Sequence, residues 1–166
     1  MPDARLLLIL LPAALVLGGC QLNPVYAGGN ASAPATLLAD IAIAPIPERA
    51  GFMVRQALED QFGLGVASPR YRLEVVLDDQ ISAFGVRGDS SAARERRTLR
   101  ARYRLIDAAT GAVLVDDTAA ADAGIDRVSS NLAVVAAETT ALERLSTDIA
   151  RQISARLARY ARTTKG

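Results

Sequence analysis

The sequence contains no histidine and only one cysteine, Cys20. Without histidine it cannot form a Ser-His-Asp or Cys-His catalytic arrangement, nor a zinc site that uses imidazole. A Gly-rich phosphate-binding loop is also missing, because Gly63-Leu64-Gly65 follows a predicted helix rather than a strand and lacks the remaining glycine pattern. These absences exclude the commonest hydrolase and nucleotide-binding sites, and we expect neither a metal nor a cofactor.

Two acidic doublets are the remaining candidates for catalysis. Asp78-Asp79 and Asp116-Asp117 offer the carboxylate pair that glycoside hydrolysis requires. Both lie in predicted strands, where neighbouring side chains point to opposite faces, so neither doublet converges on one substrate bond. We interpret them as solvated strand ends and predict that the protein is not an enzyme. An envelope hydrolase that uses acidic residues stays open as an alternative, and it predicts loss of turnover when Asp78 or Asp116 is replaced.

The single cysteine follows a segment typical of an export signal, residues 1–19. Arg5 lies in a short polar start, an apolar run extends from Leu6 to Val16, and Gly18-Gly19 precede the cysteine. The run is shorter than the roughly 20 apolar residues of a membrane span. Small residues directly before a cysteine resemble the lipobox of bacterial lipoproteins, in which the thiol and the new amine are acylated. We therefore expect cleavage before Cys20 and a stable lipid anchor, since each buried methylene adds about 0.8 kcal/mol.

The residues after Cys20 indicate the destination and the domain organisation. The next residue is Gln21 rather than the aspartate that lipoproteins of the inner membrane often carry, so the resemblance implies sorting to the outer membrane. Lipidation of Cys20 leaves no thiol for a disulfide. Residues 20–36 are small, polar and turn-prone toward their end, which predicts a lipidated flexible tether. Residues 37–166 are predicted to form a single domain.

Hydrophobic periodicity predicts the elements of this domain. They are a strand over 41–46, a helix from Pro47 to Gly63, a strand from Tyr71 toward Phe84, a strand over 98–105, a turn over 107–111, a strand from Ala112 to near Val128, and a helix over 131–162 capped by Ser129 or Ser130. The fold class is therefore α+β, with two helices packed on one face of a mixed sheet of about four strands, in the order β-α-β-β-β-α. Parallel pairing of the first strand is plausible because a helix supplies the crossover.

Two of these strands have matching patterns that predict a hairpin. When Leu73 is placed opposite Leu105, Glu74 faces Arg104 and Asp78 faces Arg100. In this register the apolar residues of both strands share one face, and the charged residues of both strands share the other. The arginines at 100, 102 and 104 are accordingly predicted to form cross-strand ion pairs on a solvated face.

Arginine is concentrated in and around this hairpin, with nine arginines against five acidic residues between Arg70 and Arg104. The connection over 85–97 is long and polar, and it contains Arg87, Arg94, Arg96 and Arg97. Arginine binds phosphate and carboxylate in a bidentate manner, so a cluster at a loop tip suits an anionic ligand. A loop that is merely soluble is the alternative. Nucleic acid is a poor candidate partner because the chain is expected to be exported.

At this point the chain resembles the LptE family of lipopolysaccharide-assembly lipoproteins, especially its alphaproteobacterial members. The resemblance depends on Cys20 with Asn23-Pro24-Val25-Tyr26, and on three segments in the strands and last helix. These segments are Tyr71-Arg72-Leu73-Glu74-Val75, Ala101-Arg102-Tyr103-Arg104-Leu105 and Ile149-Ala150-Arg151-Gln152-Ile153-Ser154-Ala155-Arg156-Leu157. Asn23 stands where an arginine is common in the family.

The resemblance implies a lipoprotein anchored in the outer membrane through acyl chains on Cys20 and facing the periplasm. Such a protein plugs the LptD β-barrel and assists lipopolysaccharide in reaching the outer leaflet. Family members use basic residues on protruding loops to contact lipopolysaccharide, so Arg87, Arg94, Arg96 and Arg97 are the candidate binding residues by position. The alternative in another class is a lipoprotein accessory subunit of a lipid-transport ABC system, which would co-purify with an inner-membrane ATPase.

Overall fold

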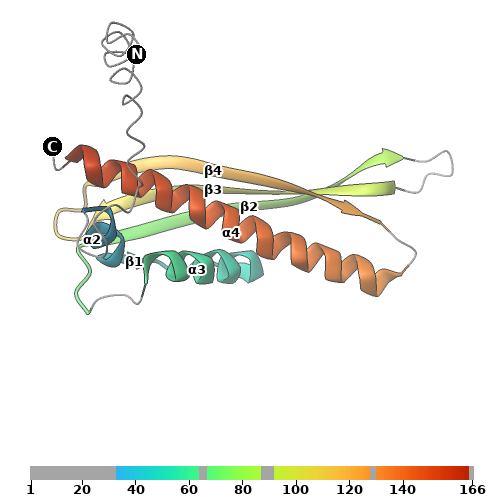
Figure 1. Ribbon diagram of the computed structural model, residues 1–166, viewed down its shortest axis with the longest axis horizontal. Coiled ribbons are helices and arrows are strands. Elements are labelled where there is room, and N and C mark those ends of the chain that lie inside the picture. Colours follow the sequence, from blue (N-terminus) through green and yellow to red (C-terminus); the bar gives the residue numbers. More distant parts are fainter. Residues whose placement is uncertain (1–32, 64–66, 87–91, 128–129, 165–166) are drawn as a thin grey trace, which may run out of the picture.

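The computed structural model describes residues 33–63, 67–86, 92–127 and 130–164. Figure 1 shows an elongated molecule in which the long last helix runs diagonally along the sheet. The elements in chain order are α2 (Ala33–Ala39), β1 (Ile41–Ile43), α3 (Glu48–Phe62), β2 (Tyr71–Val86), β3 (Ala92–Asp107), β4 (Val113–Asp126) and α4 (Asn131–Thr164). The predicted α+β class is confirmed, with one additional helix, α2, before the first strand.

The four strands form one mixed sheet in the order β1-β2-β3-β4. β1 pairs with β2 in parallel, as the crossover through α3 requires, and the other two pairs are antiparallel. The predicted hairpin register is confirmed, since Leu73 lies opposite Leu105, Glu74 opposite Arg104 and Asp78 opposite Arg100.

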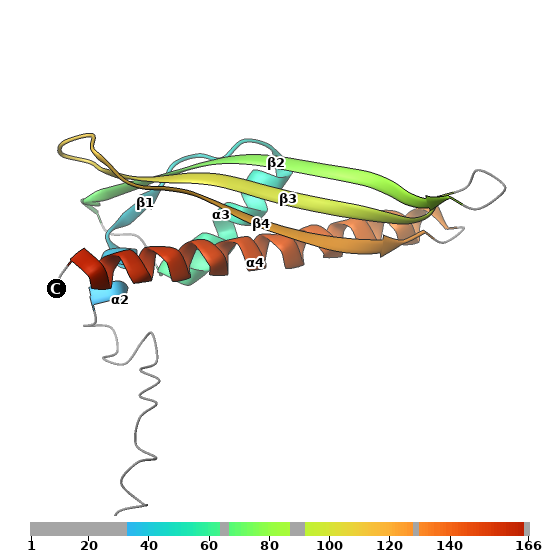
Figure 2. The ribbon, with the colours of Figure 1, turned by 90° about the horizontal axis from the view of Figure 1, so that it is seen from above.

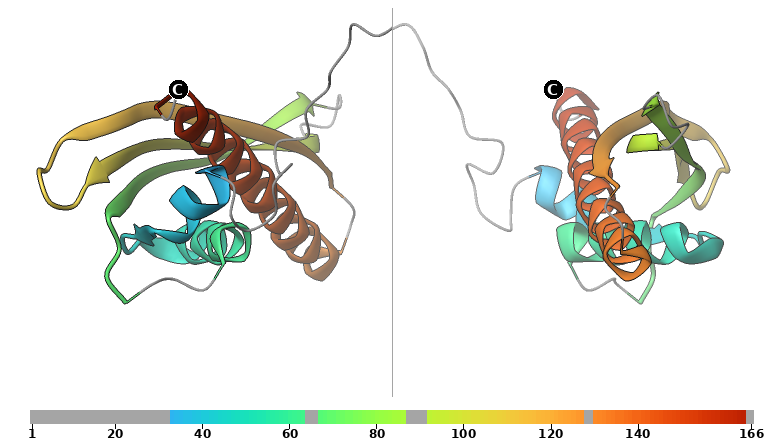
Figure 3. Two further views of the ribbon diagram at one scale, coloured as in Figure 1. Left: turned by 60° about the vertical axis from the view of Figure 1, so that its left-hand side comes forward. Right: turned by 90° about the vertical axis from the view of Figure 1, so that its right-hand side faces the viewer.

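Both long helices cover the same face of the sheet, as Figure 2 shows. This face contributes alternate residues of the strands, so that Leu73, Leu99 and Leu105 are fully buried. The facing stripe of α4 includes Ile149 and Ile153, which are also fully buried. Burial of each such side chain contributes about 1.5–3 kcal/mol. Figure 3 shows how strongly the sheet twists over these helices.

β4 is a regular strand even where its sequence consists mostly of small residues. Ala119 is buried and Ala121 and Ala123 are half-buried on the face toward α4, which packs directly against this strand. The helix contributes a small residue of its own, the fully buried Ala150. Because both elements contribute alanine, the backbones of β4 and α4 can approach closely. The low hydrophobicity of β4 therefore reflects close packing. The predicted cap is confirmed at Ser130, whose hydroxyl oxygen accepts a hydrogen bond from the Ala133 N–H at 3.4 Å.

The ordered structure begins earlier than predicted. α2 includes residues 33–36, which the sequence analysis assigns to the flexible tether, and its Pro34, Leu37 and Leu38 side chains are buried. α2 contacts α4, and this packing stabilises a helix too short to be stable alone. The rest of the predicted tether, including Cys20, lies outside the described residues.

The connection between β2 and β3 is shorter than predicted, and this part of the sequence interpretation is wrong. β2 extends to Val86 and β3 begins at Ala92, so Arg94, Arg96 and Arg97 lie in a strand rather than in a loop. The sequence does not reveal this part of the strand because residues 94–97 are charged on both faces, so the alternation of apolar and polar residues is missing. Arg87 lies outside the described residues. Figure 1 shows that this hairpin continues well past α3.

Candidate functional site

The exposed face of the sheet, opposite the helices, carries a row of arginines on its central strand. Because side chains alternate along a strand, every second residue of β3 projects from this face. The row consists of Arg94, Arg96, Arg100, Arg102 and Arg104, all of them exposed. We call this surface the arginine face.

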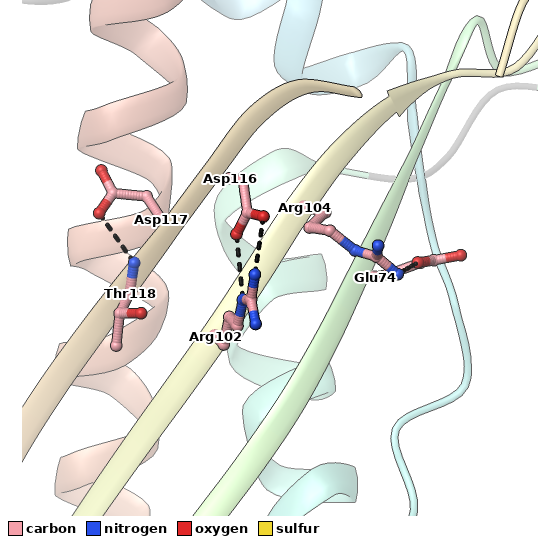
Figure 4. Close-up of polar contacts among 6 residues, drawn as sticks. All are labelled: Glu74, Arg102, Arg104, Asp116, Asp117 and Thr118. Atoms are coloured by element: carbon pink, nitrogen blue, oxygen red, sulfur yellow. Dashed lines mark hydrogen bonds and ion pairs between the residues drawn. The ribbon is translucent and has the colours of Figure 1, made fainter. Parts of the chain in front are cut away.

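The end of the arginine face nearest the 107–111 turn is occupied by ion pairs, shown in Figure 4. Arg104 Nη2 lies 2.7 Å from Glu74 Oε2. Arg102 binds Asp116 through two hydrogen bonds, from Nε at 3.2 Å and from Nη2 at 3.0 Å. The hydrogen bond from Arg102 lowers the pKa of Asp116. At this end the predicted cross-strand pairing is therefore confirmed, and the arginines are engaged with carboxylates of the same sheet.

The end of the arginine face nearest the connection between β2 and β3, which we call the hairpin tip, also carries ion pairs. Arg94 donates from Nε to Asp126 Oδ1 at 2.9 Å, and Arg96 Nε lies 3.9 Å from Asp122 Oδ2. Their side chains are 64% and 56% exposed. A guanidinium has five N–H donors, and within the described part of the chain Arg94 uses one of them, toward Asp126. Arginines in this position suit a bidentate contact with an anionic group from outside.

Arg100 has no ion pair among the described residues, although Asp78 lies directly opposite in the register. The Asp78 carboxylate instead accepts a hydrogen bond from Gln80 Nε2 at 3.0 Å. The predicted ion pair between Arg100 and Asp78 is therefore wrong, and the Arg100 guanidinium remains exposed in the middle of the arginine face.

Arg97 projects to the opposite, helix-covered face and has a different role. Its Nε and Nη2 donate to the two carboxylate oxygens of Asp79 at 2.9 and 2.5 Å. Its Nη1 donates to the backbone carbonyl of Glu138 in α4 at 2.9 Å. The Arg97 and Asp79 side chains are only 12% and 19% exposed. We call these three residues the Arg97 latch, because they join β2 and β3 to α4.

A second half-buried pair lies beside the latch, and the sequence analysis did not find it. Glu95 is 8% exposed, and its Oε1 accepts a hydrogen bond from Arg127 Nη1 at 2.9 Å. The signal that could have revealed both pairs is the alternation over 94–97, in which outward arginines at 94 and 96 are interleaved with inward Glu95 and Arg97. The structure therefore brings Arg94 and Arg96 together on one face and separates Arg97 from them.

The acidic doublets are split across the sheet, as predicted. Asp78 and Asp116 project to the arginine face, whereas Asp79 and Asp117 project toward the helices. Asp117 accepts hydrogen bonds from the Thr118 N–H at 2.8 Å and from Arg156 Nε at 2.9 Å, and these two bonds lower its pKa. The doublets lie within strands rather than at their ends, and three of the four carboxylates form ion pairs.

Two titratable groups in the cleft between β4 and α4, Tyr103 and Asp117, have shifted pKa values. The cleft has a volume of about 260 Å³ and is lined by Tyr103, Asp117, Gln152, Arg156 and Arg159, among others. Burial raises the pKa of Tyr103 to about 12, while the pKa of Asp117 is lowered. Both shifts move away from the neutral range in which a general acid or base works best. Among the described residues, no cluster of side chains could hold a metal ion, and no helix is long and apolar enough to cross a membrane.

Comparison with solved structures identifies lipoproteins with the same fold. A lipoprotein from Caulobacter crescentus CB15 is 26% identical with a TM-score of 0.69, and the match covers 81% of this chain and 99% of that one. A minor lipoprotein from Acinetobacter baumannii is 13% identical with a TM-score of 0.54, over 71% and 87% of the two chains. Lipoprotein B from Nitrosomonas europaea is 16% identical with a TM-score of 0.54, over 76% and 83%.

Comparison with curated protein sequences finds no match. The family model LptE, described as lipopolysaccharide-assembly, matches residues 38–157. This range begins in α2 and extends far into α4, so it includes every strand of the sheet. The chain therefore belongs to the LptE family of lipopolysaccharide-assembly proteins.

Proposed function

We propose that this protein is a lipoprotein of the outer membrane that plugs and helps to assemble the LptD β-barrel and assists the insertion of lipopolysaccharide into the outer leaflet. Acyl chains on Cys20 anchor it on the periplasmic side. It acts by binding and positioning rather than by catalysis. The observation that carries the proposal is the family match over residues 38–157, which covers the whole sheet and most of α4.

The shape and surface of the molecule support this role. Figure 1 shows a narrow, elongated wedge, a form suited to the lumen of a large barrel. The core is closed by apolar packing of α3 and α4 on one face of the sheet, which leaves the arginine face available to a partner or ligand.

We assign lipopolysaccharide contact to the arginines near the hairpin tip, Arg87, Arg94 and Arg96. Phosphate groups of lipid A and core sugars are anionic, and arginine binds such groups through paired hydrogen bonds. Arg94 and Arg96 are exposed, with 64% and 56% of their side chains accessible, so a phosphate group can approach them from outside. Arg97, which the sequence analysis included in this set, donates to Asp79 and Glu138, so we assign it to stability instead.

The partner is tested by affinity capture of the tagged, lipidated protein from detergent-solubilised outer membranes. The expected result is retention of one large β-barrel in near-stoichiometric amount, identified by mass spectrometry. Depletion of the protein should also leave that barrel misassembled. Capture of an inner-membrane ATPase complex in place of a barrel would support the transport-accessory alternative and contradict the proposal.

The ligand contact is tested by Arg94→Gln together with Arg96→Gln, with Arg87→Gln as an additional step. Binding of purified lipopolysaccharide should weaken severalfold at low salt, and the difference should shrink as salt screens the charges. The matched control is Arg102→Gln with Arg104→Gln, which removes two charges from the same face and strand at its other end. Equal losses in both pairs would indicate general charge attraction and would remove the hairpin tip from the binding site.

A further inference from the structure

A cavity of about 90 Å³ lies where α2, the start of β2 and the last turns of α4 meet. Its lining includes Leu37, Asp40, Arg70, Tyr71, Tyr160 and Ala161. A cavity that holds one water needs only roughly 10–15 Å³, so this cavity is large enough for an apolar side chain. Figure 2 shows α2 beside the C-terminal end of α4, and the cavity is therefore at the end of the molecule where the described chain begins.

The walls of this cavity are suited to an aromatic or aliphatic side chain with one polar tip. Tyr71 and Tyr160 are half-buried, and Leu37 closes the apolar side. The guanidinium of Arg70 lies 5.6 Å from the centroid of the Tyr71 ring. The Asp40 carboxylate forms no ion pair or side-chain hydrogen bond within the described residues, so a hydroxyl or amide donor can bind it.

The chain itself supplies a segment of this chemistry close to the cavity. Ala33, the first described residue, is part of the lining. Upstream of it, residues 27–32 are alanine, glycine, asparagine and serine, and they are preceded by Pro24-Val25-Tyr26. Ala33 is the seventh residue after Tyr26, and an extended chain spans up to about 3.4 Å per residue, or about 24 Å. Tyr26 is therefore within reach of the cavity, and the two glycines allow the chain to turn back.

We propose that Pro24-Val25-Tyr26 docks in this cavity, with the Tyr26 ring against Tyr71 and Tyr160 and its hydroxyl donating to Asp40. Aromatic rings prefer offset or edge-to-face contacts with one another, and a buried tyrosine hydroxyl needs a hydrogen-bond partner. This cavity provides both. The docking does not depend on the proposed function, since it involves only residues of this chain.

Docking of Tyr26 would determine how far the domain can move from the membrane. Ala33 is the thirteenth residue after Cys20, which gives an extended reach of about 45 Å. With Tyr26 bound, the anchor is only six positions from the docked residue, and the reach falls to about 20 Å. The α2 end of the domain would then face the membrane surface, and the hairpin tip would point away from it.

The test uses Tyr26→Trp as a single fluorescent probe, because the natural sequence contains no tryptophan. The probe is measured in the processed lipidated chain in detergent and in the same chain carrying Cys20→Ser. We expect blue-shifted emission and severalfold weaker acrylamide quenching than for a free indole in both proteins. Ala161→Leu fills the cavity from α4 and should restore quenching to the free value. Ala136→Leu, the same exchange at the exposed far end of α4, should change nothing.

The other outcomes contradict the proposal in distinct ways. Quenching at the free value in the parent protein means that the segment does not dock. Protection that persists with Ala161→Leu means that it docks elsewhere. Protection only in the lipidated protein assigns the effect to acyl chains or detergent, and protection that rises with protein concentration assigns it to a second copy. Because none of these readouts uses LptD or lipopolysaccharide, failure here leaves the proposed function intact.

Discussion

Arg97→Met is expected to lower the free energy of unfolding by about 3 kcal/mol. The substitution leaves the Asp79 carboxylate, 19% exposed, without its two hydrogen bonds, and it removes the donor to the Glu138 carbonyl. An unpaired charge in such a position costs far more than an exposed ion pair contributes. Urea denaturation followed by circular dichroism measures the change.

Two further variants separate the Arg97 latch from a general effect of charge. Arg96→Met removes the neighbouring arginine, which is 56% exposed, and should alter stability by less than about 0.5 kcal/mol. Arg97→Met combined with Asp79→Leu removes both charges and should recover much of the loss, because no buried carboxylate remains unpaired. If Arg97→Met behaves like Arg96→Met, the latch does not contribute to stability and Arg97 returns to the set of candidate ligand contacts.

Gly51→Ala is expected to destabilise the protein by about 2 kcal/mol. A methyl group at this position of α3 would lie 2.5 Å from the carbonyl oxygen and 2.7 Å from the carbonyl carbon of Ile46. Contacts this short are not formed, so α3 would have to move away from the backbone that follows β1. The same exchange in an open helix stabilises it by about 1 kcal/mol, and the predicted effect therefore has the opposite sign.

The matched control is Gly124→Ala in β4, where an added methyl group meets no atom within 4 Å. Glycine is unfavourable inside a strand, so this exchange should be neutral or stabilising by up to about 1 kcal/mol. Thermal unfolding of both variants measures the sign of each change in stability. A neutral or stabilising Gly51→Ala would show that α3 does not approach Ile46 as closely as described.

Predictions based on local sequence patterns were mostly confirmed, because each rested on neighbours in the chain or on a single pair of strands, although β1 ends at Ile43 rather than at residue 46. The end of α3 is an example: Gly63 has a φ of 85°, and its N–H donates to the Glu59 carbonyl at 2.9 Å. The turn after β3 is another, since Gly111 has a φ of 73°. Both positions require a left-handed backbone that glycine adopts without strain.

The interpretation failed where charged residues face the interior. Residues 94–97 have no apolar alternation, so the sequence analysis predicted a loop where the structure has part of β3. What allows Arg97 and Glu95 to be buried is the position of their partners, Asp79 and Arg127, which lie 18 and 32 residues away in the chain. Partners at such separations are brought together only by the sheet and its packing against α4.

The sequence by itself determined the class of fold, the hairpin register and the lack of histidine-based chemistry, because these depend on composition and on alternation along single strands. Only the tertiary structure showed that residues 94–97 belong to β3 and which of these arginines are exposed. Arg94 and Arg96 lie on the exposed face, whereas Arg97 lies on the other, where Asp79 and Glu138 from distant parts of the chain accept its hydrogen bonds. The same packing made α2 part of the domain, since its buried residues find their contacts on α4 rather than in neighbouring sequence.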